Sequence, residues 1–351
     1  MISPADDERD AASLRTRASD WEDWDESAVR TRPNPKANRP RSKRRPAHDD
    51  AQEALVTAVD RGRYQLHVLG SGAAVTAARA RELRRTQIVT GDRVSAVGDL
   101  SGAEGSLARI VSVLPRTTVL RRSADDTDTF ERIVVANADR LLIVVAAAEP
   151  EPSLGFIDRC IVAALDAGIE PVVVVTKTDL ASSQLVRDHL SALEVRVIDS
   201  SLAHPAAEAV REVTLDHVAV LVGHSGVGKS TLLNAVAPEA GRATGHVNAV
   251  TGRGRHTSSS ALAIAVHAAA NDRTGWLIDT PGVRSFGLGH VQADHIFTAF
   301  PDLVELVPLV ERTPLAELDA DALAQRVAPE LHARVASLVR MLRNAAQRAQ
   351  Y

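Results

Sequence analysis

The sequence predicts an α/β fold in which a small β-barrel precedes a doubly wound domain and a helical segment follows it. Three observations support this prediction. Short strands separated by glycines fill residues 53–122, apolar runs alternate with helix-length segments from 139 onward, and one apolar helical stripe lies beyond 290. We therefore expect a disordered arm at 1–50, a barrel at 51–122, an α/β domain at 123–288 and a helical domain at 289–351.

The charge pattern changes sharply within the first fifty residues, although the chain of 351 residues has a net charge of only −4. Residues 5–26 are acidic, whereas Arg30–Arg45 holds eight cations among sixteen residues and a single apolar side chain, Ala37. Such a segment cannot bury a core, so we expect it to be disordered. Its cations either neutralise nucleic-acid phosphates by counterion release or form a solvated tail. Composition leaves both interpretations open.

The barrel is predicted by five short strands with glycine turns between them. We place the strands at Leu55–Val59, Arg63–Val68, Ala73–Ala78, Asp92–Val97 and Leu107–Leu114. Their number and spacing are typical of an oligonucleotide-binding barrel. A barrel that serves only as a structural adaptor has the same pattern, so its function stays open.

A different pattern begins near Asp139, where near-continuous apolar runs are typical of parallel strands buried on both faces. The runs are Leu141–Ala147, Val172–Val175, Val195–Ile198, Val218–Val222 and Trp276–Ile278. After about His290 the apolar residues repeat with a helical period. They are Val327, Leu331, Val335, Leu338, Val339 and Leu342. We expect this stripe to pack against residues 291–310 or against the α/β domain.

A complete phosphate-binding loop, Gly223–Thr231, directly follows the run Val218–Val222 and opens a helix. The backbone N–H groups of such a P-loop surround phosphates, and the helix dipole adds to the attraction. Lys229 is expected to reach the β and γ oxygens, and Ser230 is expected to ligate Mg²⁺. The predicted nucleotide contacts are Gly223, His224, Ser225, Gly226, Val227, Gly228, Lys229, Ser230 and Thr231.

The choice of base is predicted by Thr176-Lys-Thr-Asp179, which resembles the guanine-binding NKxD motif. Asp179 would accept hydrogen bonds from guanine donors that adenine lacks, while the stem of Lys177 would pack along the ring. Thr176 replaces the usual Asn, so it is open whether this position braces the P-loop. A short serine loop follows the next apolar run. The predicted base-side GTP contacts are Thr176, Lys177, Thr178, Asp179, Ser200 and Ser201.

A third motif, Asp279–Gly282, also follows a strand-like run. Asp279 is expected to hold Mg²⁺ through a water molecule, and the N–H of Gly282 is expected to sense the γ-phosphate. Val283 stands where Ras-like GTPases place the Gln that orients water. Hydrolysis must therefore be organised differently.

The stretch Gly252–Ser260 is polar and contains glycine, as expected of a mobile switch loop. Within it, Thr257 is predicted to ligate Mg²⁺. His256 is the polar group that we expect to orient the attacking water. For His256 a contact with solvent or RNA is the alternative interpretation.

The order of these motifs is unusual, because the base motif precedes the P-loop, whereas ordinary GTPases place it last. The sequence thus predicts a circularly permuted P-loop GTPase domain with the usual sheet and site. Because of the permutation, the segment after Gly282 leads directly into the C-terminal part. A shift at Gly282 is therefore expected to reach that part.

This arrangement closely resembles the ribosome small subunit-dependent GTPase A family, from about Arg30 onward. The resemblance is carried by TKTDL, GHSGVGKSTLLN, GRGRHT and DTPGVRSFGL in this order, behind a barrel. It implies an enzyme that hydrolyses GTP with Mg²⁺ during late maturation of the small ribosomal subunit, contacts its rRNA and is stimulated by it. It also places the family's proposed catalytic histidine at His256, with Lys229 neutralising phosphate charge.

Two other function classes are alternatives for this chain. In the first, the chain is a nucleotide-gated rRNA-binding module in which hydrolysis is only a slow timer. In the second, it is a metabolic P-loop kinase, which is disfavoured because no phospho-acceptor site is visible and the base motif indicates guanine.

One departure from the family is substantial, since its members usually carry a Cys/His zinc knuckle after the GTPase domain. Residues 290–351 contain no cysteine, and Cys160 is the only one in the chain. A structural zinc site needs about four nitrogen or sulfur ligands, so no zinc is predicted. No apolar run approaches the ~20 residues that span a bilayer. We expect a cytoplasmic monomer without a membrane partner.

Overall fold

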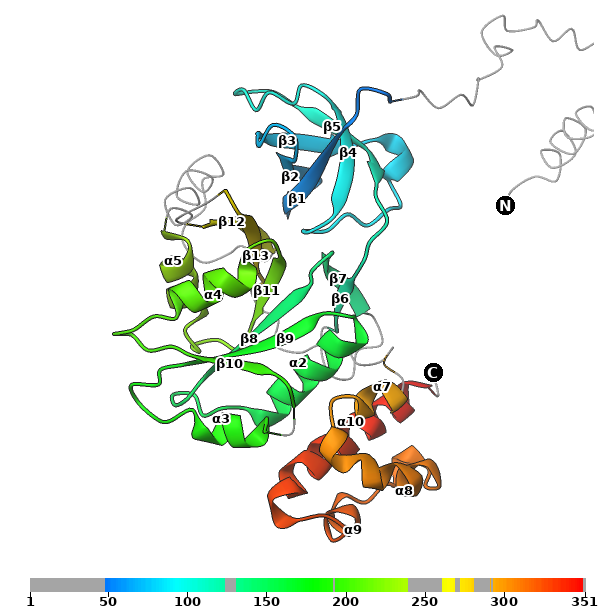
Figure 1. The fold of residues 1–351 in the computed structure, drawn as a ribbon. Helices are drawn as coiled ribbons and strands as arrows, with labels where there is room; N and C mark the ends of the chain where they lie inside the picture. Colours follow the sequence, from blue (N-terminus) through cyan, green and yellow to red (C-terminus); the bar gives the residue numbers. More distant parts are fainter. Residues whose placement is uncertain are drawn as a thin grey trace, which may run out of the picture. The chain divides into compact units, whose positions relative to one another are not determined.

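The computed structural model describes residues 48–123, 131–191, 193–238, 261–268, 272–280, 291 and 293–349. Figure 1 traces these residues from the barrel strands through the α/β part to the C-terminal helices. The arm predicted at 1–50 lies outside the described residues except for its last three positions.

The first part is a closed five-stranded barrel, as predicted. Its strands are β1 (Gln52–Asp60), β2 (Arg63–Val68), β3 (Ala74–Arg79), β4 (Arg93–Gly98) and β5 (Ala108–Val113), with the short helix η3 (Arg81–Leu83) after β3. They pair in the order β1-β2-β3-β5-β4, and β4 pairs back to β1, so the sheet has no open edge within the barrel. Alternate side chains such as Leu66, Val94 and Ile110 fill the interior.

The junction between the barrel and the next part is built from polar contacts around the fully buried Asp92. Arg116 donates to both carboxylate oxygens of Asp92, at 2.7 and 2.9 Å, and this ion pair raises the pKa of Arg116. Nearby, Asn137 Nδ2 donates to the carbonyl of Gly91 at 2.9 Å. Gly91 has a φ of +89°, and a Cβ there would lie 2.1 Å from the Ala136 carbonyl oxygen. The close approach therefore requires glycine.

The second part is a mostly parallel sheet. Its strands are β8 (Arg140–Ala146), β9 (Glu170–Thr176), β10 (Arg196–Asp199), β11 (Val218–Val222), β12 (Leu262–His267) and β13 (Thr274–Asp279). The order is β10-β9-β8-β11-β13-β12; neighbouring pairs are parallel except that β12 runs antiparallel to β13. Strand β12 also meets barrel strand β1 at the pair Ala58 and Leu262. All five predicted runs fall on strands, and β12 was not predicted.

Two further strands escaped the sequence prediction. Strands β6 (Val119–Ser123) and β7 (Glu131–Ala136) form a separate two-stranded antiparallel sheet. The backbone N–H of Ala136 in β7 donates to the Thr90 carbonyl at 3.1 Å, which links this small sheet to the barrel side of the junction.

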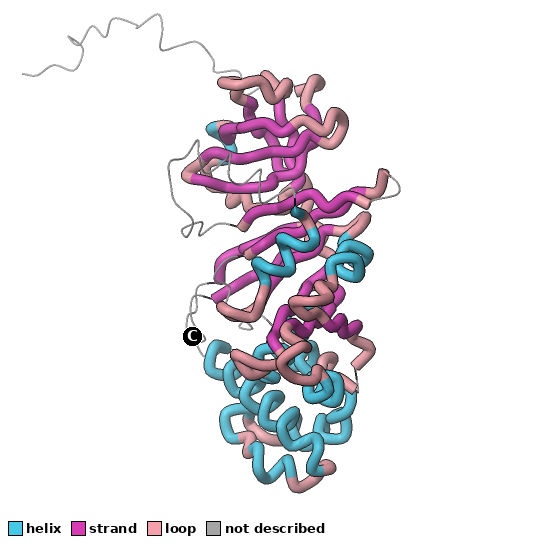
Figure 2. The backbone as a smooth tube through the Cα atoms, turned by 90° about the vertical axis from the view of Figure 1, so that its left-hand side faces the viewer, coloured by secondary structure: helices cyan, strands magenta, loops and turns pink. Residues whose placement is uncertain are grey.

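Helices cover both faces of the parallel sheet, which explains its near-continuous apolar runs. On one face lie α2 (Leu154–Asp166) and α3 (Gln184–His189), and on the other lie α4 (Ala207–Thr214) and α5 (Lys229–Val236). Along β8 the side chains alternate between the two cores, with Ile143 facing α2 and Leu142 belonging to the α4–α5 side. Figure 2 shows the strands and the helices that accompany them.

The described residues of the C-terminal part form helices joined by turns and short loops, with no strand among them. It comprises α7 (Ala293–Phe297), η4 (Pro301–Leu306), α8 (Val307–Glu311), η5 (Leu315–Glu317), α9 (Ala320–Ala324), η6 (Pro329–Leu331) and α10 (His332–Ala349). Two residues of the predicted apolar stripe, Val327 and Leu331, are partly buried and precede α10. The rest of the stripe is buried on α10, where Val335, Leu338 and Leu342 have no exposed surface. These residues form one hydrophobic cluster with Phe300 and with α2. The C-terminal helices thus share a core with one face of the sheet.

No helix in the described ranges is both long and apolar enough to cross a membrane. Among the same residues, no group of three or more His, Cys, Asp or Glu side chains is placed to hold a metal ion. The absence of zinc from the C-terminal part stays a prediction.

The buried stripe generates a first prediction. Leu338→Asp places a charge in a fully buried apolar position, which costs more than ~4 kcal/mol unless the helix is released. We expect this variant to lose the C-terminal helices, seen as a lower Tm and faster proteolysis beyond 291. The control Val304→Asp changes a residue of the same part that is 66% exposed. It should melt like the wild type, and an equal effect of both changes would contradict the shared core.

Candidate functional site

The predicted motifs meet at one edge of the sheet. Strands β9, β10, β11 and β13 are parallel within it, and their carboxyl ends therefore point to the same side. Thr176 ends β9, Val222 ends β11 immediately before the P-loop, and Asp279 ends β13. Ser200 follows the last residue of β10. Residues far apart in the sequence thus form one continuous rim.

The P-loop has the backbone geometry that its glycines predict. Gly223 has a φ of +154°, and a Cβ there would lie 2.3 Å from the carbonyl oxygen of Val144 in β8. Gly228, with a φ of +91°, immediately precedes the first residue of α5, Lys229. A residue with a side chain cannot be accommodated at Gly223 unless strand β8 moves. The loop is therefore seated directly on the sheet.

Lys229 is held inside the loop by its own backbone. Its Nζ donates to the carbonyl oxygens of Gly223 at 2.6 Å and His224 at 2.7 Å. Burial lowers the pKa of Lys229, and the nearby carboxylate of Asp279 partly opposes this shift. Burial likewise raises the pKa of Asp279, against the influence of Lys229 and the Thr280 N–H. Both charges are thus poorly solvated at the place where phosphate is expected.

Thr176, at the position where GTPases usually have Asn, makes a direct hydrogen bond to the P-loop. Its hydroxyl lies 2.5 Å from the carbonyl oxygen of Val227 in the P-loop and 3.1 Å from that of Val145 in β8. A hydroxyl has one proton, and the shorter contact is the one to the loop. Thr176 is 5% exposed, so this hydrogen bond is sheltered from water. A threonine therefore braces the P-loop from the position of the usual Asn.

The base side of the site is a pair of interlocked loops. The N–H and the hydroxyl of Thr178 both donate to the carbonyl of Ser200, at 3.2 and 3.1 Å. Asp179 accepts from the N–H of Leu202 at 3.3 Å. The hydroxyl of Ser201 accepts from the N–H of His204, which shapes the serine loop. The two predicted base-contacting segments are thus adjacent in space.

Lys177 also lies at this base-side rim. It has a φ of +56°, and its ammonium group contacts the carbonyl of Glu149, in the loop after β8. The contact ties the base motif to a third loop of the rim.

Two contacts of the site were not predicted from the sequence. Phe156, in the first turn of α2, packs its ring against that of His224 in the P-loop, with 4.3 Å between centroids. Thr280 donates its buried hydroxyl to the carbonyl of Leu221 at 2.8 Å, which ties the end of β13 to β11. Thr280 could have been suspected because it lies within the Asp279–Gly282 motif, whereas Phe156 could not.

Three predicted site residues lie outside the described residues: His256, Thr257 and Gly282. The remaining candidates are all described, and they converge on the rim. The donors present there suit Mg²⁺, which prefers oxygen ligands. Ser230 is an exposed residue in the first turn of α5, and Asp279 offers a carboxylate whose charge is poorly solvated because of burial.

The brace generates a second prediction. Thr176→Val keeps the shape of the side chain but removes its hydrogen bond to Val227, worth about 1 kcal/mol. We expect guanine-nucleotide affinity to fall about fivefold, measured by titration with a fluorescent GDP analogue. Thr176→Ser should restore it. The matched control is Thr214→Val, which removes a buried hydroxyl bonded within α4 and should leave affinity unchanged. Equal affinity of Thr176→Val and wild type would contradict the brace.

The buried carboxylate generates a third prediction, on pH. Because burial raises the pKa of Asp279, ionisation of this group disfavours the folded state as pH rises through that pKa. Asp279→Asn removes the ionisation. In nucleotide-free, Mg²⁺-free protein, the Tm of the variant relative to wild type should therefore increase from about pH 4 to neutral. A difference that stays constant over this range would show that Asp279 is not penalised by burial.

Comparison with known proteins identifies similar proteins. The family described as RsgA GTPase matches residues 113–289, just over half of the chain. A curated protein from Pseudomonas savastanoi pv. phaseolicola, named small ribosomal subunit biogenesis GTPase RsgA, is 38% identical over 227 residues. The match spans 63% of this chain and 63% of that relative's length, which is less than two thirds.

Two solved structures show the same fold. YjeQ from Thermotoga maritima aligns with a TM-score of 0.58 at 22% identity, over 84% of this chain and 98% of its own. YloQ, titled a circularly permuted GTPase, aligns with a TM-score of 0.57 at 20% identity, over 87% of this chain and 98% of its own. The permuted order of motifs, the barrel and the family match agree, and the chain belongs to the RsgA GTPase family.

Proposed function

We propose that this chain is a GTP phosphohydrolase that converts GTP and water to GDP and phosphate. It acts in late maturation of the small ribosomal subunit, and the subunit stimulates its turnover. The observation that carries the proposal is the direct hydrogen bond between the base motif and the P-loop, from Thr176 to Val227. Base recognition and phosphate binding are thereby parts of one rigid rim.

The residues of the rim divide the work of the reaction. Asp179 selects guanine through its two acceptor oxygens, and Ser200 and Ser201 border the base. Lys229 would leave the carbonyls of Gly223 and His224 and neutralise phosphate oxygens instead, because phosphate is the stronger acceptor for an ammonium group. In this proposal His256 orients the attacking water, and Gly282 senses the γ-phosphate.

Ser230, Thr257 and Asp279 would hold Mg²⁺, with Asp279 acting through water. When bound, the ion offsets charge that develops on the phosphate oxygens. Burial makes the Asp279 carboxylate a receptive group for a cation, since its own charge is poorly solvated.

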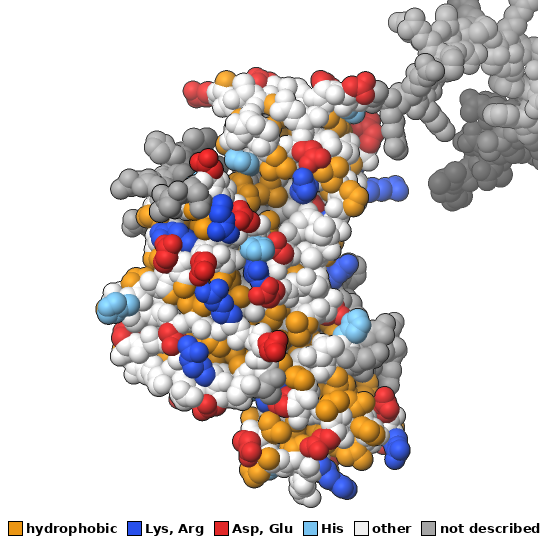
Figure 3. Space-filling model, viewed as in Figure 1, with side chains coloured by type: hydrophobic (Ala, Val, Ile, Leu, Met, Phe, Trp, Pro, Cys, Tyr) orange, Lys and Arg blue, Asp and Glu red, His pale blue; other side chains and the backbone are white. Residues whose placement is uncertain are grey.

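The proposed partner is the small subunit and its rRNA. On the face in Figure 3, cationic and anionic side chains are mixed over the α/β part. The densest cluster of cations in the sequence is Arg30–Arg45, and we assign rRNA phosphate contacts to it. Support also comes from the name of the Pseudomonas relative, a small ribosomal subunit biogenesis GTPase. We further propose that the protein is a cytoplasmic monomer and that its C-terminal part holds no zinc. The proposed domain boundaries are an arm at 1–50, a barrel at 51–122, a GTPase domain at 123–288 and a helical domain at 289–351.

The test combines base choice with subunit stimulation and forms a fourth prediction. Phosphate release from GTP is measured with and without purified small subunits, and we expect faster turnover with them. Asp179→Asn loses one charge-assisted acceptor, so GTP affinity should fall about 10- to 100-fold while binding of xanthosine triphosphate improves.

The matched control is Asp188→Asn, which changes an exposed carboxylate on α3 that accepts from Gln184. It should behave as wild type. Unchanged GTP affinity in Asp179→Asn would remove the base assignment. Turnover that is slow and indifferent to the subunit would instead favour the nucleotide-gated binding module with hydrolysis as a timer.

A further inference from the structure

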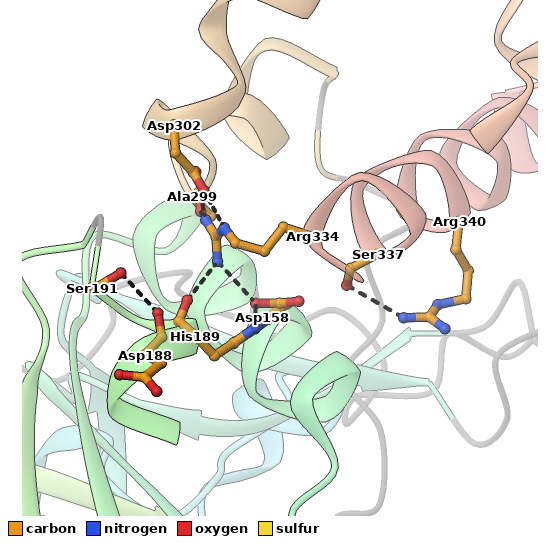
Figure 4. Close-up of polar contacts among 9 residues, drawn as sticks. All are labelled: Asp158, Asp188, His189, Ser191, Ala299, Asp302, Arg334, Ser337 and Arg340. Atoms are coloured by element: carbon orange, nitrogen blue, oxygen red, sulfur yellow. Dashed lines mark hydrogen bonds and ion pairs between the residues drawn. The ribbon is translucent and has the colours of Figure 1, made fainter. Parts of the chain in front are cut away.

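The C-terminal helices reach α2 through a buried ionic cluster (Figure 4). Arg334 of α10 donates to both oxygens of Asp302 in η4, at 2.5 and 2.9 Å, and to the carbonyl of Ala299 at 2.9 Å. On its other side the guanidinium lies 3.5 Å from Asp158 of α2. His189, at the end of α3, approaches the same Asp158 oxygen at 2.7 Å. The side chains of Arg334 and Asp158 are only 3% and 2% exposed.

The cluster is unequal on its two sides. Arg334 is bidentate to Asp302, within the C-terminal part, whereas its contact with Asp158 is long. The second carboxylate oxygen of Asp158 is buried and has no hydrogen-bond partner among the described atoms. A buried charge with incomplete partners is costly. The guanidinium of Arg334 is therefore bound mainly within the C-terminal part, and its contact with Asp158 of α2 is the weaker one.

A second contact joins the same two helices at the beginning of α2. A Cβ on Gly155 would lie 2.4 Å from Nη2 of Arg340, so this guanidinium lies directly on the first turn of α2. Arg340 is exposed and also donates to Ser337 on its own helix. Arg334 and Arg340 of α10 thus both contact α2. Their contact points on α2, Asp158 and Gly155, lie within one helical turn of each other.

The same turn of α2 contacts the phosphate site. Phe156 follows Gly155, is 2% exposed and packs against the ring of His224 in the P-loop. The carbonyl of His224 is one of the two acceptors that hold Lys229. A displacement of α2 would therefore move the part of the loop that receives phosphate. Thr176 braces the loop at Val227, and Phe156 supports it at His224.

We propose that Phe156 is a positioning residue for the P-loop, and that α2 transmits the placement of the C-terminal helices to the nucleotide through Arg334 and Arg340. This inference rests on the proposed GTP site and adds its regulation. A partner that binds the C-terminal helices would change nucleotide affinity through α2 and Phe156. This coupling would act in addition to the one expected from the chain connection after Gly282.

The test measures affinity and dissociation rate of a fluorescent GDP analogue in full-length protein. Phe156→Leu keeps an apolar side chain but removes the ring against His224, and Arg340→Ala changes an exposed residue without emptying the core. We expect each to weaken GDP binding, about tenfold and about threefold respectively. In the double variant, Arg340→Ala should add nothing to Phe156→Leu, because both act through the same turn of α2.

The matched control is Arg343→Ala, which removes another exposed guanidinium of α10 whose contact, the Leu318 carbonyl, lies within the C-terminal part. It should bind GDP like the wild type. The proposal is overturned if both single variants keep wild-type affinity while only their melting temperatures fall, or if their effects on affinity are additive. A wild-type protein that binds no guanine nucleotide would instead refute the proposed function.

Discussion

Parallel pairing of β9, β8, β11 and β13 is the constraint on which the whole candidate nucleotide site depends. It brings the ends of these strands to one edge, where a base motif, a P-loop and a carboxylate can meet although they are far apart in sequence. Helices on both faces make that arrangement stable, because each strand buries side chains on two sides. The polar rim is therefore held by an apolar sheet.

This constraint also explains why permuting the chain leaves the site intact. What the site requires is that each motif follow the carboxyl end of the correct strand, and the sheet order β10-β9-β8-β11-β13 satisfies this whichever strand comes first in the chain. The permutation changes what is attached to the rim. Here the barrel enters through the junction around Asp92, and the C-terminal helices cover α2.

Much of this architecture could be predicted from residue patterns, because apolar runs and glycine turns are local signals. Arg63–Val68 and Val218–Val222 were predicted with their exact boundaries. Strand β12, Leu262–His267, was missed because it alternates Ala with larger residues and so lacks a continuous run of large apolar side chains. Strand β6 was missed because it includes Arg121 and Arg122, which interrupt its apolar pattern. These strands owe their structure to partners rather than to composition.

In the candidate site, too, some features follow from local sequence patterns and others depend on tertiary structure. The identity of the P-loop and base motifs follows from spacing, but the hydroxyl of Thr176 braces Val227 only through tertiary geometry. The Arg334–Asp158 contact joins residues separated by 176 positions, and neither residue belongs to a motif. Interactions of this kind depend on the packing of whole helices, which no local pattern encodes.

The shared core of α2 and α10 has a consequence for how the chain is made. Synthesis proceeds from the N-terminus, so the sheet and the P-loop leave the translating ribosome before α10 exists. Until then, apolar residues of α2 that α10 will cover, in the cluster of Leu338 and Leu342, stay open to solvent. The nascent α/β part is thus incompletely buried during its own translation, and a product that stops before α10 would expose an apolar surface to chaperones and proteases.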